Sequence, residues 1–154
     1  MAFAGSNIES ITIPSSVVKI DVAAFHLINT LKSVKFEYGS KISILPYSLF
    51  DATPNIEELI LPSSIREIHE GVFNGWKNVY KIYLCSNHDL SRVDLTGVTG
   101  TLQVYASYSY KRLYKTFGGI DVITPNHFCD IIYSCDNEKY KHFSKNNFLF
   151  IMRF

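Results

Sequence analysis

A short pattern of apolar residues recurs along most of this chain. The segment from Ile8 to Val17, IESITIPSSV, returns as the segment from Ile56 to Ile65, IEELILPSSI. A supersecondary unit that repeats about every 23 residues predicts a solenoid, in which each unit covers the apolar side of the next. The unit starts follow the pattern apolar-x-x-apolar-x-apolar at Ile8/Ile11/Ile13, Leu31/Val34/Phe36, Ile56/Leu59/Leu61, Val79/Ile82/Leu84 and, in degraded form, Thr99/Leu102/Val104.

Each unit has two halves with different periodicity. The first half alternates polar and apolar residues, as in residues 10–13 (SITI), and predicts a short half-buried strand. Pro14 and Pro62 directly follow two of these strands, and proline cannot donate to a ladder, so we expect the strands to end there. The second half, residues 17–25 for example, spaces its apolar residues three and four apart, which favours a helical or 3₁₀ turn. Stacking then predicts an internal column of Phe25, Phe50 and Phe73.

The unit resembles the BspA-like leucine-rich repeat, Leu-x-x-Ile-x-Ile-Pro-x-Ser-Val-x-x-Ile-(Gly)-x-x-Ala-Phe. Residues 8–25 match this pattern almost position by position, and the resemblance extends to Ile123. Asp21, Pro46 and His69 stand where the family prefers Gly, and the Cys common after the Phe is absent. The resemblance implies an α/β solenoid, a leucine-rich-repeat horseshoe with short parallel strands on its concave face. It also implies a microbial or protist surface or interaction protein.

The last part of the repeat region predicts a helix near residues 107–117. Tyr110, Leu113, Tyr114 and Phe117 follow the spacing i, i+3, i+4, i+7 of one apolar face. Ser107 or Ser109 can cap its start, and Gly118 can supply a left-handed stop. Because BspA-like arrays often finish in this way, we expect a capping helix followed by a last strand at residues 120–123. The predicted domains are a solenoid of about four to five repeats at 1–123 and a tail or extra cap of unknown structure at 124–154.

The N-terminal residues indicate that the chain begins inside a unit. Ala2-Phe3 precede Ile8 as Ala24-Phe25 precede Leu31. A terminal unit without a polar cap exposes apolar surface. End-to-end self-association is therefore expected.

Composition and charge narrow the functional classes. A hydrophobic content of 47% with 19% charged residues suits a folded solenoid. The net charge of +1 is not the electrostatic footprint of a nucleic-acid binder. Neither a secretory signal nor a span of the ~20 apolar residues that cross a bilayer is visible in the sequence. The localisation stays open between the cytoplasm, which the missing signal favours, and the cell surface, which the resemblance favours.

Reactive side chains do not gather into a recognisable chemical site. Cys85, Cys129 and Cys135 have no metal-binding spacing; Cys129 and Cys135 could pair, but free thiols in a reducing compartment are favoured. His88 and Asp89 lie near Cys85, yet an inserted loop offers neither apolar shielding nor an orienting third group. No catalytic residue, metal site or cofactor is predicted, and we do not expect an enzyme.

The strand alternation predicts a binding face. If the apolar strand residues point inward, their neighbours form two rows on the concave sheet. Ile60 beside Tyr83 then places an apolar and an aromatic side chain together on a polar surface, the kind of patch that anchors a protein contact. The pair could instead serve only as a stabilising cross-strand contact. The two rows are Ser10, Ser33, Glu58, Lys81, Thr101 and Thr12, Lys35, Ile60, Tyr83, Gln103. The candidate protein-binding residues are Thr12, Lys35, Glu58, Ile60, Lys81, Tyr83 and Gln103.

Two functions follow from these patterns. The first is a non-catalytic module that binds a protein, or a surface glycan, through its concave strands. The alternative is a structural spacer within a longer repeat array that has no ligand of its own. An enzyme or a nucleic-acid reader is the least favoured class.

Overall fold

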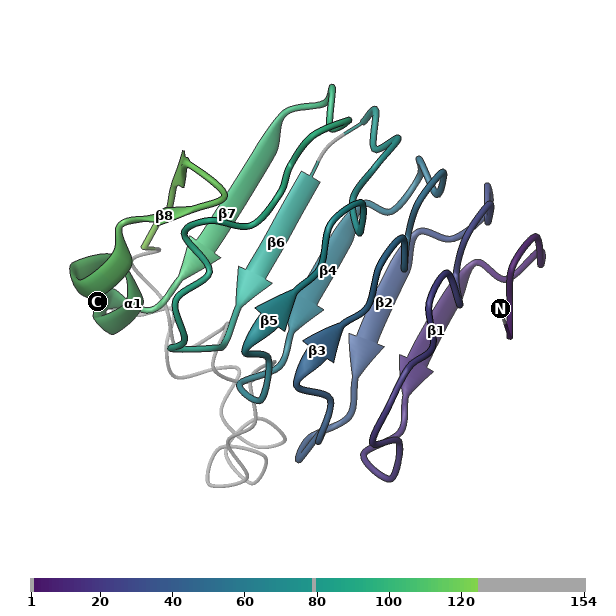
Figure 1. The fold of residues 1–154 in the computed structure, drawn as a ribbon, viewed down its shortest axis with the longest axis horizontal. Coiled ribbons are helices and arrows are strands. Elements are labelled where there is room, and N and C mark those ends of the chain that lie inside the picture. Colours follow the sequence, from purple (N-terminus) through teal and green to yellow (C-terminus); the bar gives the residue numbers. More distant parts are fainter. Residues whose placement is uncertain (1, 79, 125–154) are drawn as a thin grey trace, which may run out of the picture.

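The computed structural model describes residues 2–78 and 80–124, which form a stack of similar coils (Figure 1). One side of the stack is a five-stranded parallel sheet in the order β1-β2-β4-β6-β7. Its strands are β1 (Ser10–Ile13), β2 (Ser33–Phe36), β4 (Glu58–Leu61), β6 (Tyr80–Leu84) and β7 (Leu102–Ala106). The opposite side is built from turns and from two short parallel strands, β3 (Ile44–Leu45) and β5 (Glu67–Ile68). The predicted solenoid is confirmed.

Equivalent residues of successive units occupy adjacent rungs of the sheet. Ile11 pairs with Val34, Val34 with Leu59, and Leu59 with Ile82. The first four unit starts were therefore read in the correct register, although Val79 itself lies outside the described residues. β1 ends immediately before Pro14 and β4 immediately before Pro62, as the missing amide hydrogen of proline predicts.

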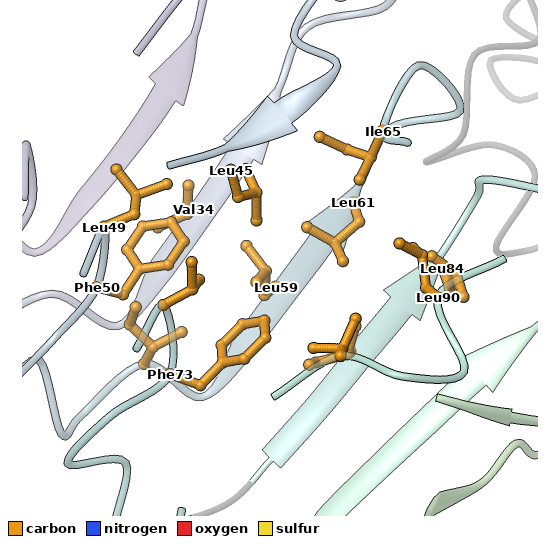
Figure 2. Close-up of a cluster of buried hydrophobic side chains, with 14 of the residues drawn as sticks. Val34, Leu45, Leu49, Phe50, Leu59, Leu61, Ile65, Phe73, Leu84 and Leu90 are labelled. Carbon is orange, nitrogen blue, oxygen red and sulfur yellow. The ribbon is translucent and has the colours of Figure 1, made fainter. Parts of the chain in front are cut away.

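The core lies between the sheet and the turns, and a column of aromatic rings runs along it. The rings of Phe3 and Phe25 stack with centroids 5.5 Å apart, and those of Phe25 and Phe50 with centroids 5.7 Å apart. Trp76 then links Phe50, at 6.3 Å, to Phe73, at 4.9 Å. Figure 2 shows strand residues directed towards Phe50 and Phe73 from the sheet side. The predicted Phe column is confirmed, with Trp76 as an unpredicted member.

The turn side of each unit differs from the helical or 3₁₀ turn that the spacing predicted. Consecutive turns interrupted by left-handed residues replace it, because positive φ angles at matching places end any helical run. One such column contains Gly5, Leu27, Ala52, Gly75 and Gly97. Successive amides alternate between two kinds of hydrogen bond. The Phe25 amide donates to the Leu49 carbonyl of the next unit at 3.1 Å, whereas the Ala24 amide donates to the Asp21 carbonyl of its own turn at 3.3 Å.

Side-chain hydroxyl groups form hydrogen bonds between neighbouring units. Thr53 is fully buried, and its Oγ1 donates to the Phe25 carbonyl at 2.7 Å. The Ser64 hydroxyl donates to the Ile42 carbonyl at 2.6 Å. Ser64, a residue of the Pro-Ser-Ser segment, therefore bridges two units.

The C-terminal part of the described chain contains one helix, α1 (Tyr108–Tyr114), with Ser107 as its N-cap. The helix is shorter than predicted because Lys115 already adopts φ 65°; Gly118 lies further on, in a turn. Tyr110 is fully buried as expected, but Leu113 is 58% exposed and was wrongly placed in the core. Tyr114 is half-buried, and its ring lies 5.1 Å from the Tyr110 ring. A role for α1 as the cap of the stack stays a prediction.

After α1 the chain forms a small antiparallel hairpin and then rejoins the main sheet. The hairpin pairs β8 (Thr116–Phe117) with β9 (Ile120–Asp121). Of the last strand that was predicted at 120–123, β9 therefore forms only the first two residues. Ile123 makes a parallel bridge to Tyr105 beside β7. The expected boundary between a solenoid at 1–123 and a tail at 124–154 stays a prediction, since residues 125–154 lie outside the described part.

Candidate binding surface

The outward-facing residues of the five-stranded sheet form its open face. Among the described residues, Thr12, Lys35 and Lys81 are exposed there, whereas Glu58, Ile60 and Tyr83 are half-buried. Each of them alternates with a core residue, as in β4, where Leu59 and Leu61 are fully buried. The structure thus places these six candidate residues on one face, as the alternation predicted.

The last rung of the two predicted rows requires a correction. Lys81 pairs with Gln103, and Tyr83 pairs with Tyr105, so Gln103 belongs to the first row and not to the second. Thr101 precedes β7 and belongs to neither row. The predicted register is wrong here because Leu102, Val104 and Ala106 are all buried, and the prediction aligned Leu102 with Ile82 and Val104 with Leu84. The same period-two pattern, followed through to Ala106, would have identified Tyr105.

Tyr105 turns the predicted pair of residues into a longer apolar surface. The rings of Tyr83 and Tyr105 stack with centroids 5.2 Å apart and planes 20° apart. Ile60 is the partner of Tyr83 on β4. On the other side, Ile123 bridges to Tyr105 and is 40% exposed, while the preceding Val122 is 2% exposed, so Ile123 continues the outward row. We call Ile60, Tyr83, Tyr105 and Ile123 the apolar strip.

Polar groups line one side of the apolar strip. Glu58, Lys81 and Gln103 occupy consecutive rungs of the adjacent row. The Tyr105 hydroxyl donates to Gln103 Oε1 at 3.2 Å. Burial, followed by the nearby Glu58 carboxylate and Tyr105, raises the pKa of Tyr83 above its ordinary value. Tyr83 therefore keeps its proton at neutral pH and can donate a hydrogen bond to a ligand.

A positive charge stands at one end of the strip. Lys35 is exposed and lies in the same row, one rung before Ile60 if the pairing of Val34 with Leu59 is extended by a residue. The described part of the chain contains the ion pair Lys19–Asp21 and two contacts between a His ring and a carboxylate, His26–Asp51 and His69–Glu67, all on the turn side. Neither Lys35 nor Lys81 takes part in them, but Lys81 has the acidic Glu58 as its cross-strand neighbour, so Lys35 is the better candidate to meet an incoming anionic group.

The loop that carries Cys85, His88 and Asp89 does not form a nucleophilic site. Cys85 is disulfide-bonded, which makes the expected free thiol wrong at this position. Cys129, Cys135 and a bond between those two lie outside the described residues. Asp89 accepts hydrogen bonds from the Ser91 hydroxyl at 2.6 Å and from the Ser91 amide at 3.0 Å, and these hold its pKa below the usual value. The Asp89 carboxylate is thus engaged by its own turn instead of orienting His88.

Within residues 2–78 and 80–124, no group of three His, Cys, Asp or Glu side chains could hold a metal ion. No helix in the same ranges has the length and apolar character required to cross a membrane.

Parallel rungs, recurring Pro-Ser-Ser turns and a stacked Phe column define a leucine-rich-repeat type of solenoid. The family described as BspA type leucine rich repeat region (6 copies) matches residues 1–94, and the chain belongs to this family. No curated protein and no solved structure matches the chain. The match includes Lys35, Ile60 and Tyr83, whereas Tyr105 and Ile123 lie beyond it.

Proposed function

We propose that this chain is a non-catalytic interaction module that binds a protein through the open face of its sheet. The observation that supports this function is the apolar strip, four adjacent apolar and aromatic side chains on a surface that is otherwise polar. Partly exposed aromatic residues within a polar rim are typical of the centres of protein interfaces. The leucine-rich-repeat family favours the same class of function, and surface adhesion would be one form of it.

The strip differs from a set of core residues in what it contributes to the fold. Tyr83 and Tyr105 lie on the side of the sheet opposite to the fully buried Ile82 and Val104. Their stacking contributes only about 0.5–1.5 kcal/mol beyond the burial of their area. The fold therefore depends little on the ring surface that stays exposed, and a partner can bury that surface.

A double substitution tests the proposal. Ile60→Ser with Tyr83→Ser removes the middle of the strip, and Tyr108→Ser, a residue 71% exposed on α1, serves as the matched control. Immobilised wild type and control are expected to retain the same protein from cell extract, whereas the double variant should lose it with an unchanged circular dichroism spectrum. Titration calorimetry with that purified protein then measures the difference in affinity.

Three results would count against the proposal. Equal capture by the double variant and the wild type would place the interface elsewhere. Unfolding of the double variant would mean that the pair stabilises the sheet and has no separate binding role. Binding of glycans in place of protein, with the same dependence on the strip, would assign the face to carbohydrate.

A further inference from the structure

The spacing and charge of the open face identify the kind of protein segment that fits it. Resting on the proposed function, we infer that the partner presents an amphipathic α-helix that crosses the strands. Its apolar residues lie along the apolar strip, and an acidic residue pairs with Lys35. This inference goes beyond the existence of an interface, because it specifies the conformation and the charge pattern of the bound segment.

The spacing of the strip matches a helix better than an extended peptide. The strip residues lie on adjacent rungs, which are about 4.8 Å apart in a sheet, and the Tyr83 and Tyr105 rings are 5.2 Å apart. Helix residues at i, i+3, i+7 and i+10 recur on average about every 5.0 Å along one face. Alternate residues of an extended strand recur about every 6.7 Å.

The difference grows along the strip. Three rung steps separate Ile60 from Ile123, a distance of about 14 Å at the ordinary strand spacing. Three helix steps cover about 15 Å, whereas three steps of an extended peptide cover about 20 Å. A helix can therefore place one apolar side chain against each of the four strip residues, and an extended peptide drifts out of register by more than one rung.

The position of Lys35 beyond one end of the apolar strip indicates which end of the bound helix carries an acidic residue. Lys35 lies one rung beyond Ile60, so it faces the position one helical turn beyond the apolar residue that contacts Ile60. The described residues include no ion pair that already neutralises Lys35. An Asp or Glu in that position would pair with the Lys35 ammonium group.

Selection from a peptide library tests the inference. A displayed library of random 16-residue peptides is depleted on the Ile60→Ser/Tyr83→Ser variant and then selected on the wild type. Enriched peptides should carry apolar residues at i, i+3, i+7 and i+10 with an acidic residue one turn from one end. A synthetic enriched peptide should bind with helical circular dichroism. A copy with a central proline should bind at least tenfold more weakly.

A charge exchange tests the contact with Lys35. Lys35→Glu should weaken the synthetic peptide at least about fivefold, and a peptide with Lys in place of its acidic residue should regain that affinity. Lys19→Glu, a substitution on the turn side, is the matched control and should leave the affinity unchanged. An equal effect of both variants, or no rescue by the exchanged peptide, would overturn the Lys35 contact.

The outcomes separate this inference from the proposed function. Enriched peptides with a period of two, or without helical structure when bound, would overturn the helix while leaving the face as the interface. Absence of strip-dependent peptides, with strip-dependent capture of a whole protein intact, would also overturn the helix alone. Loss of both kinds of binding would reject the proposed function itself.

Discussion

Replacing Phe50 with Ala gives the strongest test of the stacked core. Phe50 is fully buried, and its ring lies between Phe25, at 5.7 Å, and Trp76, at 6.3 Å. Its amide bonds to the Val72 carbonyl at 3.2 Å and is kept in the variant. The substitution therefore removes the ring while leaving the main-chain connection between units in place.

The expected loss follows from the cavity that the ring leaves. Truncation of a buried Phe to Ala costs about 3–5 kcal/mol. The neighbours on both sides belong to separate units and are held by their own hydrogen bonds, so the void cannot close easily. We expect about 4–5 kcal/mol, in the upper part of that range. Phe3→Ala is the matched comparison, since Phe3 is 43% exposed and stacks only on Phe25; it should cost roughly 1–2 kcal/mol.

Urea unfolding at equilibrium measures both values. Trp76 is the only tryptophan of the chain and lies beside Phe50, so its fluorescence reports on this part of the column, while circular dichroism reports on the whole stack. Repeat proteins can unfold in parts, so the two transitions must coincide before free energies are compared. Because total stability is about 5–15 kcal/mol, Phe50→Leu should be included as a milder variant that stays folded.

A small effect would refute the reasoning. A loss below about 1 kcal/mol for Phe50→Ala, with an unchanged urea dependence, would mean that no cavity forms at this position. A loss equal to that of Phe3→Ala would mean that the middle of the column is no better packed than its exposed member.

Two further predictions concern buried hydroxyl groups. Thr53→Val keeps the shape of the side chain but leaves the Phe25 carbonyl without its donor; it should lower the free energy of unfolding by about 1–3 kcal/mol, while Thr53→Ser should lose less. Burial raises the pKa of Tyr110 to about 12 from 10.0, so the unfolded chain loses this proton first and stability falls as the pH rises from 10 to 12. This contribution is at most about 2.7 kcal/mol, and urea titrations at several pH values should show it in the wild type but not in Tyr110→Phe; equal pH dependence of the two proteins would contradict it.

The repeated part of the fold could be predicted from the sequence, because all units must stack in one register. A wrong alignment of one unit would disagree with the alignment of the others. Ile11, Val34, Leu59 and Ile82 were all placed on adjacent rungs for this reason. The register failed at the fifth unit, where three buried residues at period two, Leu102, Val104 and Ala106, allow two alignments. Leu102 and Val104 alone do not choose between them, whereas continuing the pattern to Ala106 favours the alignment that places Tyr105 beside Tyr83.

Other features depend on geometry that the residue pattern does not express. Leu27 and Ala52 adopt left-handed φ angles that ordinarily favour glycine, so the turns could not be distinguished from helical ones by apolar spacing. Leu113 fits the helical spacing as well as Tyr114 does, yet Leu113 is 58% exposed and Tyr114 is half-buried, a difference that the spacing does not express. For the candidate site, Ile60 and Tyr83 were found by alternation, while Ile123 required knowledge of the chain path after the hairpin.

The separation between the two faces of the sheet has a consequence for how this protein can change. Each rung adds two side chains to the open face, and the residues that hold the coils together point the other way. Substitutions at well-separated positions without shared partners have nearly additive effects on stability. New recognition properties can therefore accumulate one rung at a time while the scaffold beneath them keeps its register.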